Sequence, residues 1–191
     1  MTLGADLVGG ARWFAGVHVF DRGRLLLTIG GESPAIAGPP PPRAHVRWIG
    51  GGPHRGESFL DCALREASEE LGCLVEIVHE PETIVELRPD PPARVRLEDR
   101  PAPLLIQRYL DSEVLVMYRA RLLGEPWPAD VERLVWVPPA AIQPLTYGVS
   151  PRDAGELGIE VLGPEPDPEA VLFVGSAGAE YLLWHLGADR P

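Results

Sequence analysis

The segment from Gly51 to Cys73 reads GGPHRGESFLDCALREASEELGC, and the interpretation of the whole chain starts from it. Gly51 and Gly52 open the segment directly after Gly50, and Pro53 and Gly56 follow them. Glycine adopts backbone angles that other residues avoid, and proline cannot extend a hydrogen-bonded element. These residues therefore predict a tight loop rather than regular structure.

A helix is expected immediately after this loop. Ser58 is a suitable N-cap, and Gly72 is placed where a left-handed C-terminal residue would end the helix. Between them the apolar residues recur at the spacing of one helix face, which predicts an amphipathic helix of about three to four turns packed on a core. That apolar stripe consists of Leu60, Ala63, Leu64, Ala67 and Leu71.

Acidic residues lie beside the apolar stripe of this helix. Glu66 and Glu70 are one turn apart and Glu69 is three residues after Glu66, so the three carboxylates share a flank. Hard divalent cations such as Mg²⁺ prefer oxygen ligands of this kind. Arg65 cannot bind a metal but can pair with a carboxylate such as Glu57. A solvated acidic face is the simpler interpretation, yet it does not explain why all these features occur in one segment.

The segment resembles the signature of the Nudix hydrolases, GX5EX7REUXEEXGU, where U is a bulky apolar residue. Every glycine, arginine and glutamate position of that pattern is matched. The departures are Ala67 and Cys73, which are small for the two U positions, and Ile49, which stands where the family often has a proline. These departures concern packing and loop shape rather than ligands. The matching residues are Gly51, Glu57, Arg65, Glu66, Glu69, Glu70 and Gly72.

The resemblance implies both a fold and a reaction. It implies an α/β fold, the Nudix-type α/β/α sandwich with a mixed β-sheet, as one domain over residues 1–191. A proline-rich insertion is expected at about residues 30–44 and a variable C-terminal extension at about residues 143–191. The implied reaction is Mg²⁺-dependent hydrolysis of a diphosphate linkage in a nucleoside diphosphate joined to another moiety, with Mn²⁺ as a substitute cofactor.

The resemblance also implies a role for each matching residue. Glu66 and Glu70 would be the core metal ligands, and Glu69 a further ligand or a group that orients water. Glu57 and Arg65 would support the loop. Gly51 and Gly52 would let the backbone approach the substrate closely.

Other site residues stay open between alternatives. The general base or an additional metal ligand could be Asp130 or Glu132, although ordinary exposed loop acids are an equal interpretation, and Glu113 ranks below both. Arg47 and Trp48 are the expected substrate contacts, Arg47 among several arginines suited to phosphate. Trp48 or Trp13 could stack on a base, although a core or sheet-face role is the favoured interpretation of both. Cys62, one turn before Glu66, is expected to be a packed thiol rather than a nucleophile, because no histidine partner is evident.

Composition limits the possible partners. The chain has 191 residues, is 45% hydrophobic and carries a net charge of −11, which argues for a folded protein and against a nucleic-acid polymer or an anionic membrane as the partner. Its two cysteines, Cys62 and Cys73, do not suggest a disulfide framework. Without a signal-like start or a long apolar span, we expect a cytoplasmic protein. A homodimer is one alternative for its assembly, because many Nudix relatives are dimers.

The remaining sequence suggests a set of strands around the central helix. Pro- and Arg-rich residues 88–103 are expected to form a mobile loop, and residues 144–168 a turn-rich segment. A short helix or a turn is expected from Pro138 to Ile142, and a helix from Ser176 to Leu186. Strands are expected at residues 11–20, 24–28, 44–49, 74–78, 83–87, 104–110, 113–123 and 134–137, with hairpins at residues 21–23 and 111–112.

Two classes of function compete. The first is a Nudix pyrophosphatase acting on ADP-ribose, a nucleotide sugar, a nucleoside triphosphate, a dinucleoside polyphosphate or coenzyme A. The alternative is a Nudix-like nucleotide-binding or sensing domain that has lost catalysis. Such domains usually lose acids from the signature, and this chain keeps all of them, which favours the enzyme.

Overall fold

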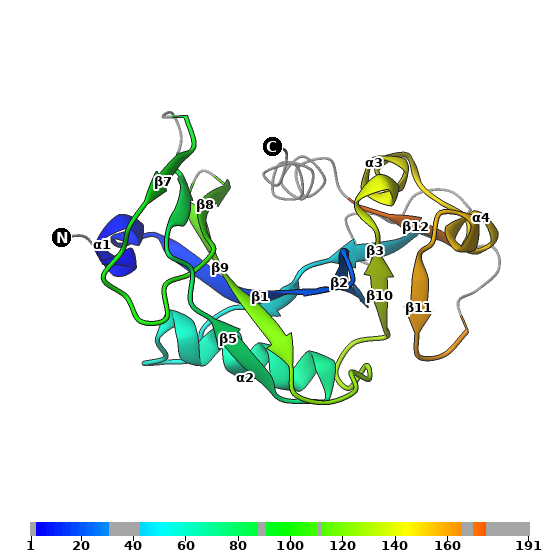
Figure 1. Ribbon diagram of the computed structural model, residues 1–191, viewed down its shortest axis with the longest axis horizontal. Helices are drawn as coiled ribbons and strands as arrows, with labels where there is room; N and C mark the ends of the chain where they lie inside the picture. Colours follow the sequence, from blue (N-terminus) through cyan, green and yellow to red (C-terminus); the bar gives the residue numbers. More distant parts are fainter. Residues whose placement is uncertain (1–2, 31–42, 88–90, 111, 166–169, 175–191) are drawn as a thin grey trace. The chain divides into compact units, whose positions relative to one another are not determined.

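The computed structural model describes residues 3–30, 43–87, 91–110, 112–165 and 170–174 (Figure 1). The chain divides into two units, each built from two stretches of sequence. The first consists of residues 1–19 and 49–126, and the second of residues 20–48 and 127–191. The expected proline-rich insertion and the expected terminal helix from Ser176 lie outside the described residues.

The first unit is built on a mixed sheet with the order β1-β9-β8-β6-β7. Strand β1 pairs in parallel with β9, β9 is antiparallel to β8, and β8 is parallel to β6. Two shorter strands extend this sheet, β4 on β1 and β5 on β9, both antiparallel. The strands are β1 (Arg12–Asp21, which ends in the second unit), β4 (Ile49–Gly51), β5 (Val75–Val78), β6 (Thr83–Glu86), β7 (Ala93–Val95), β8 (Leu105–Leu110) and β9 (Glu113–Leu122).

Two helices belong to this unit, the short α1 (Gly4–Val8) and the central α2 (Phe59–Leu71). Helix α2 contacts β4, β5 and β9, and Figure 1 shows it running beside β5 and β9. Its buried residues recur at helical spacing, as the sequence predicts, because that face packs on the sheet. They are Cys62, Ala63, Ala67 and Leu71.

The second unit has the strand order β11-β10-β2-β3-β12. All its pairings are antiparallel except that of β12 with β3. Its core is rich in leucine, and Leu25, Leu27 and Leu134 are fully or almost fully buried. The elements are β2 (Arg24–Gly30), β3 (Arg43–Arg47), β10 (Arg133–Val137), α3 (Pro139–Tyr147), α4 (Pro151–Glu156), β11 (Glu160–Leu162) and β12 (Val171–Phe173).

Most of the expected elements are confirmed, including the mixed α/β class, the helix from Ser58 to Gly72 and the antiparallel β8–β9 pair. Three expectations are wrong. Residues 88–103 are not all loop, because they contain β7 and the buried residues Leu97 and Ala102. Residues 144–168 contain α4 and β11, and the helix after Pro138 continues to Tyr147. The Pro and Gly residues of these segments suggest loops. Packing against the rest of the protein nevertheless makes strands and helices of them.

The glycine run is the third correction. Gly50 and Gly51 belong to strand β4 rather than to an irregular loop. Among the described residues, none of the helices has the length and apolar character needed to cross a membrane.

Candidate active site

Strand β4 lies unusually close to strand β1. Gly50 pairs with Gly16, and the φ angle of Gly50 is 148°, in a region that side chains avoid. A Cβ atom on Gly50 would lie 2.5 Å from the carbonyl oxygen of Ala15 and 2.6 Å from Cα of Gly16. Close packing of the two backbones therefore requires glycine at these positions. This packing fixes the position of β4 opposite α2.

Helix α2 is capped at both ends by the residues that the sequence suggests. The Ser58 hydroxyl accepts a hydrogen bond from the Asp61 amide at 3.1 Å, and the Asp61 carboxylate accepts one from the Ser58 amide at 3.4 Å. Gly72 is left-handed with φ 61°, and its amide donates to the Ser68 carbonyl at 3.2 Å. Defined ends fix the rotation of the helix and hence the direction of its acidic side chains.

Arg65 links the loop to the helix through its whole guanidinium group. Its Nε donates to Glu57 at 2.8 Å, and its Nη2 donates to Glu57 at 3.2 Å and to the Gly52 carbonyl at 2.9 Å. Its Nη1 donates to both Glu66 and Glu69, each at 2.8 Å. Five residues thus form one hydrogen-bonded network, which we call the Arg65 network: Glu57, Arg65, Glu66, Glu69 and the backbone of Gly52.

Two members of this network, Glu57 and Arg65, keep their charges at neutral pH. Hydrogen bonds from Arg65, supported by the one from the His54 amide at 2.6 Å, lower the pKa of Glu57 to about 2. The same hydrogen bond with Glu57, with further ones to Glu66 and Glu69, raises the pKa of Arg65 well above its usual range against the opposing effect of burial. The loop is therefore tied to α2 by groups that are fully charged at neutral pH.

Two carboxylates of α2 lie against consecutive residues of β4. The Gly50 amide donates to Oε2 of Glu70 at 2.9 Å. The Glu66 carboxylate occupies the place that a side chain on Gly51 would take, since a Cβ there would lie 2.5–2.6 Å from its carbon and both its oxygens. The absence of a side chain at Gly51 is thus what admits Glu66 to this position.

The donor atoms of the site suit a hard divalent cation. Glu66 and Glu70 offer only oxygen, and Glu69 adds a carboxylate that is 45% exposed. Within the described part of the chain, however, no three His, Cys, Asp or Glu side chains stand close enough together to hold a metal ion in their present positions. The Arg65 guanidinium occupies one oxygen of Glu66 and one of Glu69. The chemistry of the donors fits Mg²⁺, with Glu66 and Glu70 as the residues that would hold it.

Four of the expected site residues belong to the second unit. Arg47 is exposed on β3, with its guanidinium over Gly30, and the carbonyl of Trp48 accepts a hydrogen bond from the Thr28 hydroxyl at 3.5 Å. Asp130 and Glu132 are exposed in the segment before β10, and Glu132 pairs with Arg133 at 3.5 Å. None of the four is part of the Arg65 network.

Two further candidates have partners of their own in the first unit. The Glu113 carboxylate pairs with Arg12 at 3.3 Å. The Cys62 thiol is buried, contacts the Gly51 carbonyl at 3.6 Å, and has its pKa raised to about 11 by burial. A thiol in this state is a poor nucleophile, as expected for a packed residue.

Sequence reasoning missed the role of Gly16. Its neighbours in β1 are apolar strand formers, and a lone glycine inside a strand is a known sign that another backbone approaches closely. That signal was present in the sequence, but the partner strand could not be identified from it. The absence of a side chain at Gly16 is explained only by its pairing with Gly50 in the structure.

Comparison with known proteins identifies the family. The model of the NUDIX domain matches residues 12–154, which is well over half of the chain. The chain therefore belongs to the Nudix family of hydrolases. No protein with a curated description matches it.

Solved structures of Nudix hydrolases are similar to this chain at low sequence identity, and the first of these shares its fold. One from Clostridium perfringens is 13% identical with a TM-score of 0.51, and the match covers 95% of this chain and 100% of that one. One from Nitrosomonas europaea is 14% identical with a TM-score of 0.48, covering 95% and 73% of the two chains. An ADP-ribose pyrophosphatase from Streptococcus suis is 16% identical with a TM-score of 0.45, covering 95% and 93%.

Proposed function

We propose that this protein hydrolyses the diphosphate linkage of a nucleoside diphosphate joined to another moiety, and that it requires Mg²⁺, for which Mn²⁺ can substitute. Membership of the Nudix family supports hydrolysis. The observation that carries the proposal is the placement of Glu66 and Glu70 on Gly51 and Gly50 of β4, beside the Arg65 network. We further propose that residues 1–191 act as a single Nudix domain.

Each residue of the site has a distinct task in this proposal. Glu66 and Glu70 would hold the cation with carboxylate oxygens, and the Gly50 amide keeps the Glu70 carboxylate directed. Arg65 fixes Glu57, Glu66 and Glu69 in relative position. When bound, Mg²⁺ would neutralise phosphate oxygens and lower the pKa of a water molecule. Hydrolysis at phosphorus needs positioning and charge neutralisation, so no side-chain nucleophile is required.

The same proposal assigns roles to residues around Glu66 and Glu70. Glu69 is exposed enough to orient water or to join the ligands, and Gly52 offers a backbone free of side-chain obstruction. Arg47 and Trp48 are proposed to contact the substrate. Asp130 and Glu132 remain the proposed sources of an additional ligand or of the general base.

A screen of nucleoside diphosphate derivatives with Mg²⁺ tests this function. The parent, Glu70→Gln and the matched control Glu76→Gln are compared by release of phosphate-bearing products. Glu76 is a suitable control because its carboxylate is 59% exposed on β5 and only 3.9 Å from Arg121. We expect turnover of one class of compound that falls by at least about 100-fold in Glu70→Gln, beyond the loss typical of residues that only orient a ligand.

Three results would contradict the proposal in different ways. Equal activity of the parent and Glu70→Gln would remove Glu70 from the ligand set. Equal activity with and without the divalent cation would remove the cofactor. Binding of a nucleotide without hydrolysis of any compound would support the alternative, a nucleotide-binding or sensing domain.

A further inference from the structure

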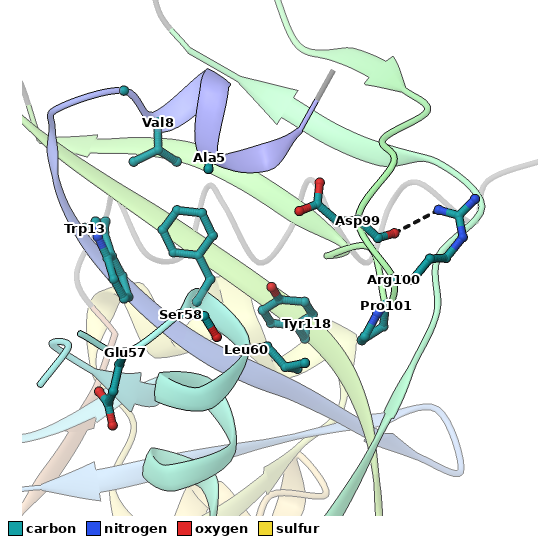
Figure 2. Close-up of a pocket in the computed structure, with 12 residues that line it drawn as sticks. Ala5, Val8, Trp13, Glu57, Ser58, Leu60, Asp99, Arg100, Pro101 and Tyr118 are labelled. Atoms are coloured by element: carbon teal, nitrogen blue, oxygen red, sulfur yellow. Dashed lines mark hydrogen bonds between the residues drawn. The ribbon is translucent and has the colours of Figure 1, made fainter. Parts of the chain in front are cut away.

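A cavity in the first unit lies beside the start of α2. Its volume is about 480 Å³, which is within the usual size of small-molecule sites. It is lined from α1, the beginning of β1, residues 57–60, residues 99–101 and β9 (Figure 2). It therefore adjoins Glu57, a member of the Arg65 network.

Tyr118 presents a hydroxyl group to this cavity without a partner in the protein. The residue is only 4% exposed and lines the cavity from β9. Within the described part of the chain, no hydrogen bond involves its hydroxyl group. Burial, with the nearby charges of Asp99 and Asp61, raises the pKa of Tyr118, so the group is a neutral phenol that can donate a hydrogen bond. The hydroxyl group is accessible from the cavity, so a ligand that enters it can accept this hydrogen bond.

Asp99 places a hydrogen-bond acceptor beside this donor. One carboxylate oxygen accepts from the Gly4 amide at 2.7 Å, and its other oxygen has no partner among the described residues. Figure 2 shows the Tyr118 hydroxyl pointing to the side of the cavity on which the Asp99 carboxylate lies. The cavity therefore offers a neighbouring donor and acceptor to whatever enters it.

Aromatic rings form another part of the lining. Trp13 and Phe59 are half-buried and contact each other edge to face, with ring centroids 4.6 Å apart. Such rings favour a flat, conjugated ligand that can stack on them. A nucleobase is such a ligand, because it is a planar ring that carries a hydrogen-bond donor and an acceptor side by side on one edge.

Charge disfavours a phosphate group inside the cavity. Two acidic residues, Glu57 and Asp99, are among its lining residues, and the Glu57 carboxylate accepts hydrogen bonds from Arg65 and the His54 amide. The only cation among the lining residues is Arg100, whose guanidinium donates to the carbonyls of Leu97 at 3.2 Å and Asp99 at 2.8 Å. The charged Arg100 side chain thus stabilises the backbone of its own segment. A neutral ring suits this environment better than an anion does.

From these observations we propose that the cavity binds the nucleobase of the substrate, with Tyr118 and Asp99 reading its polar edge and Trp13 and Phe59 contacting its face. This proposal rests on the proposed function in assuming a nucleoside in the substrate. Phe59 precedes Glu66 by seven residues of α2, about 10 Å along the helix axis. An extended nucleoside diphosphate can cover that distance, with its base in the cavity and its phosphates at the acidic residues.

Binding of nucleosides without metal tests the proposal independently of catalysis. Adenosine, guanosine, cytidine and uridine are titrated into the full chain by calorimetry, and ribose 5-phosphate serves as the probe without a base. Concentrations up to about 5 mM detect contacts worth only about 3 kcal/mol. We expect saturable binding of at least one nucleoside, weakened about five- to tenfold in Tyr118→Phe, the effect of losing one hydrogen bond.

Matched variants distinguish the loss of one contact with the nucleoside from a general loss of binding. Tyr147→Phe removes a phenol hydroxyl from a residue that is 84% exposed in the second unit, and it should bind as the parent does. Phe59→Leu keeps an apolar side chain but removes the ring, and it should weaken nucleoside binding without affecting the response to ribose 5-phosphate. Unchanged folding of each variant is verified by circular dichroism.

The proposal is overturned if no nucleoside binds, if Tyr118→Phe and Phe59→Leu both bind as the parent does, or if ribose 5-phosphate binds as tightly as the nucleosides. Because the assay contains neither a metal nor a hydrolysable bond, an inactive protein still gives a result. Conversely, an active enzyme whose KM for its nucleotide substrate is the same in Tyr118→Phe would refute the cavity's role while leaving the proposed hydrolysis intact.

Discussion

Gly16 of β1 and Gly50 of β4 face each other with their backbones in contact, so that neither position has room for a side chain. This pair holds the strand against which Glu66 and Glu70 lie. The glycine directly before the signature is thereby connected to a residue 34 positions earlier in the chain, counted from Gly16 to Gly50. Several consequences can be measured.

Gly50→Ala is expected to destabilise the fold by at least about 2 kcal/mol, because the new Cβ meets backbone atoms of β1 and the φ angle of 148° is unfavourable for alanine. Urea unfolding followed by circular dichroism measures the change. Gly10→Ala is the control, since nothing lies within 4 Å of its added Cβ. Equal midpoints for the two variants would contradict the close contact between β1 and β4.

Gly51→Ala is expected to act on activity more than on stability. The three atoms nearest to the added Cβ all belong to the carboxylate of Glu66, the far end of a flexible side chain that can move away. Displacing this carboxylate should lower kcat by about 10- to 100-fold, as for other changes that misplace a ligand. Gly155→Ala, with open space around its Cβ, should retain parental kcat. A fully active Gly51→Ala would show that the position of Glu66 does not matter for hydrolysis.

Arg65→Lys keeps the positive charge but loses the planar group that serves Glu57, Glu66, Glu69 and Gly52 at once. A single ammonium group cannot make all these contacts, so we expect kcat to fall about 10- to 100-fold and the required Mg²⁺ concentration to change. Arg121→Lys is the matched control, because Arg121 is 70% exposed and its ion pair is 3.9 Å long. Similar kinetics for the two variants would argue against a positioning role for Arg65.

Glu57 should contribute to stability in a defined pH range. Hydrogen bonding to Arg65 lowers its pKa in the folded state to about 2, below the ordinary value of 4.5. For an acid with a lowered pKa, the contribution is complete above the unfolded value and is lost as the pH falls toward the folded value. The difference in unfolding free energy between the parent and Glu57→Gln should therefore be constant above about pH 5 and shrink between about pH 4.5 and 2.

Urea unfolding at a series of pH values measures this difference in the metal-free protein. The other acidic residues titrate alike in both proteins. Subtracting one unfolding free energy from the other therefore isolates the contribution of Glu57. A difference that stays constant down to pH 3 would contradict the ion pair between Glu57 and Arg65.

The Cys62 thiol should react slowly in the native protein. Burial raises its pKa to about 11, so at pH 8 only about one thiol in a thousand is ionised. A chromogenic disulfide reagent applied to Cys73→Ala should label Cys62 only when urea unfolds the chain. We also expect Cys62→Ala to hydrolyse substrate within a few-fold of the parent. Rapid native labelling together with loss of activity would instead support a reactive role for this thiol.

The signature helix illustrates what local sequence can predict. Its caps, Ser58 and Gly72, and its buried stripe depend on interactions within about four residues, which a single segment contains. The pairing of Arg65 with Glu57 was also predictable, because both residues belong to the same segment. The family signature then connects this segment to a reaction.

The tertiary structure decided the features that depend on distant parts of the chain. The sequence predicts a loop at Gly50 and Gly51, because glycines have no local reason to be extended, and only the approach of β1 makes them part of strand β4. In the same way, Tyr118, Asp99 and Phe59 carry no common signal, since they come from β9, the segment before β8 and α2. The sequence by itself determined the helix, its charges and the family, because those are encoded at short range. The position of the carboxylates on β4 and the existence of the cavity were decided by long-range packing, which no single segment contains.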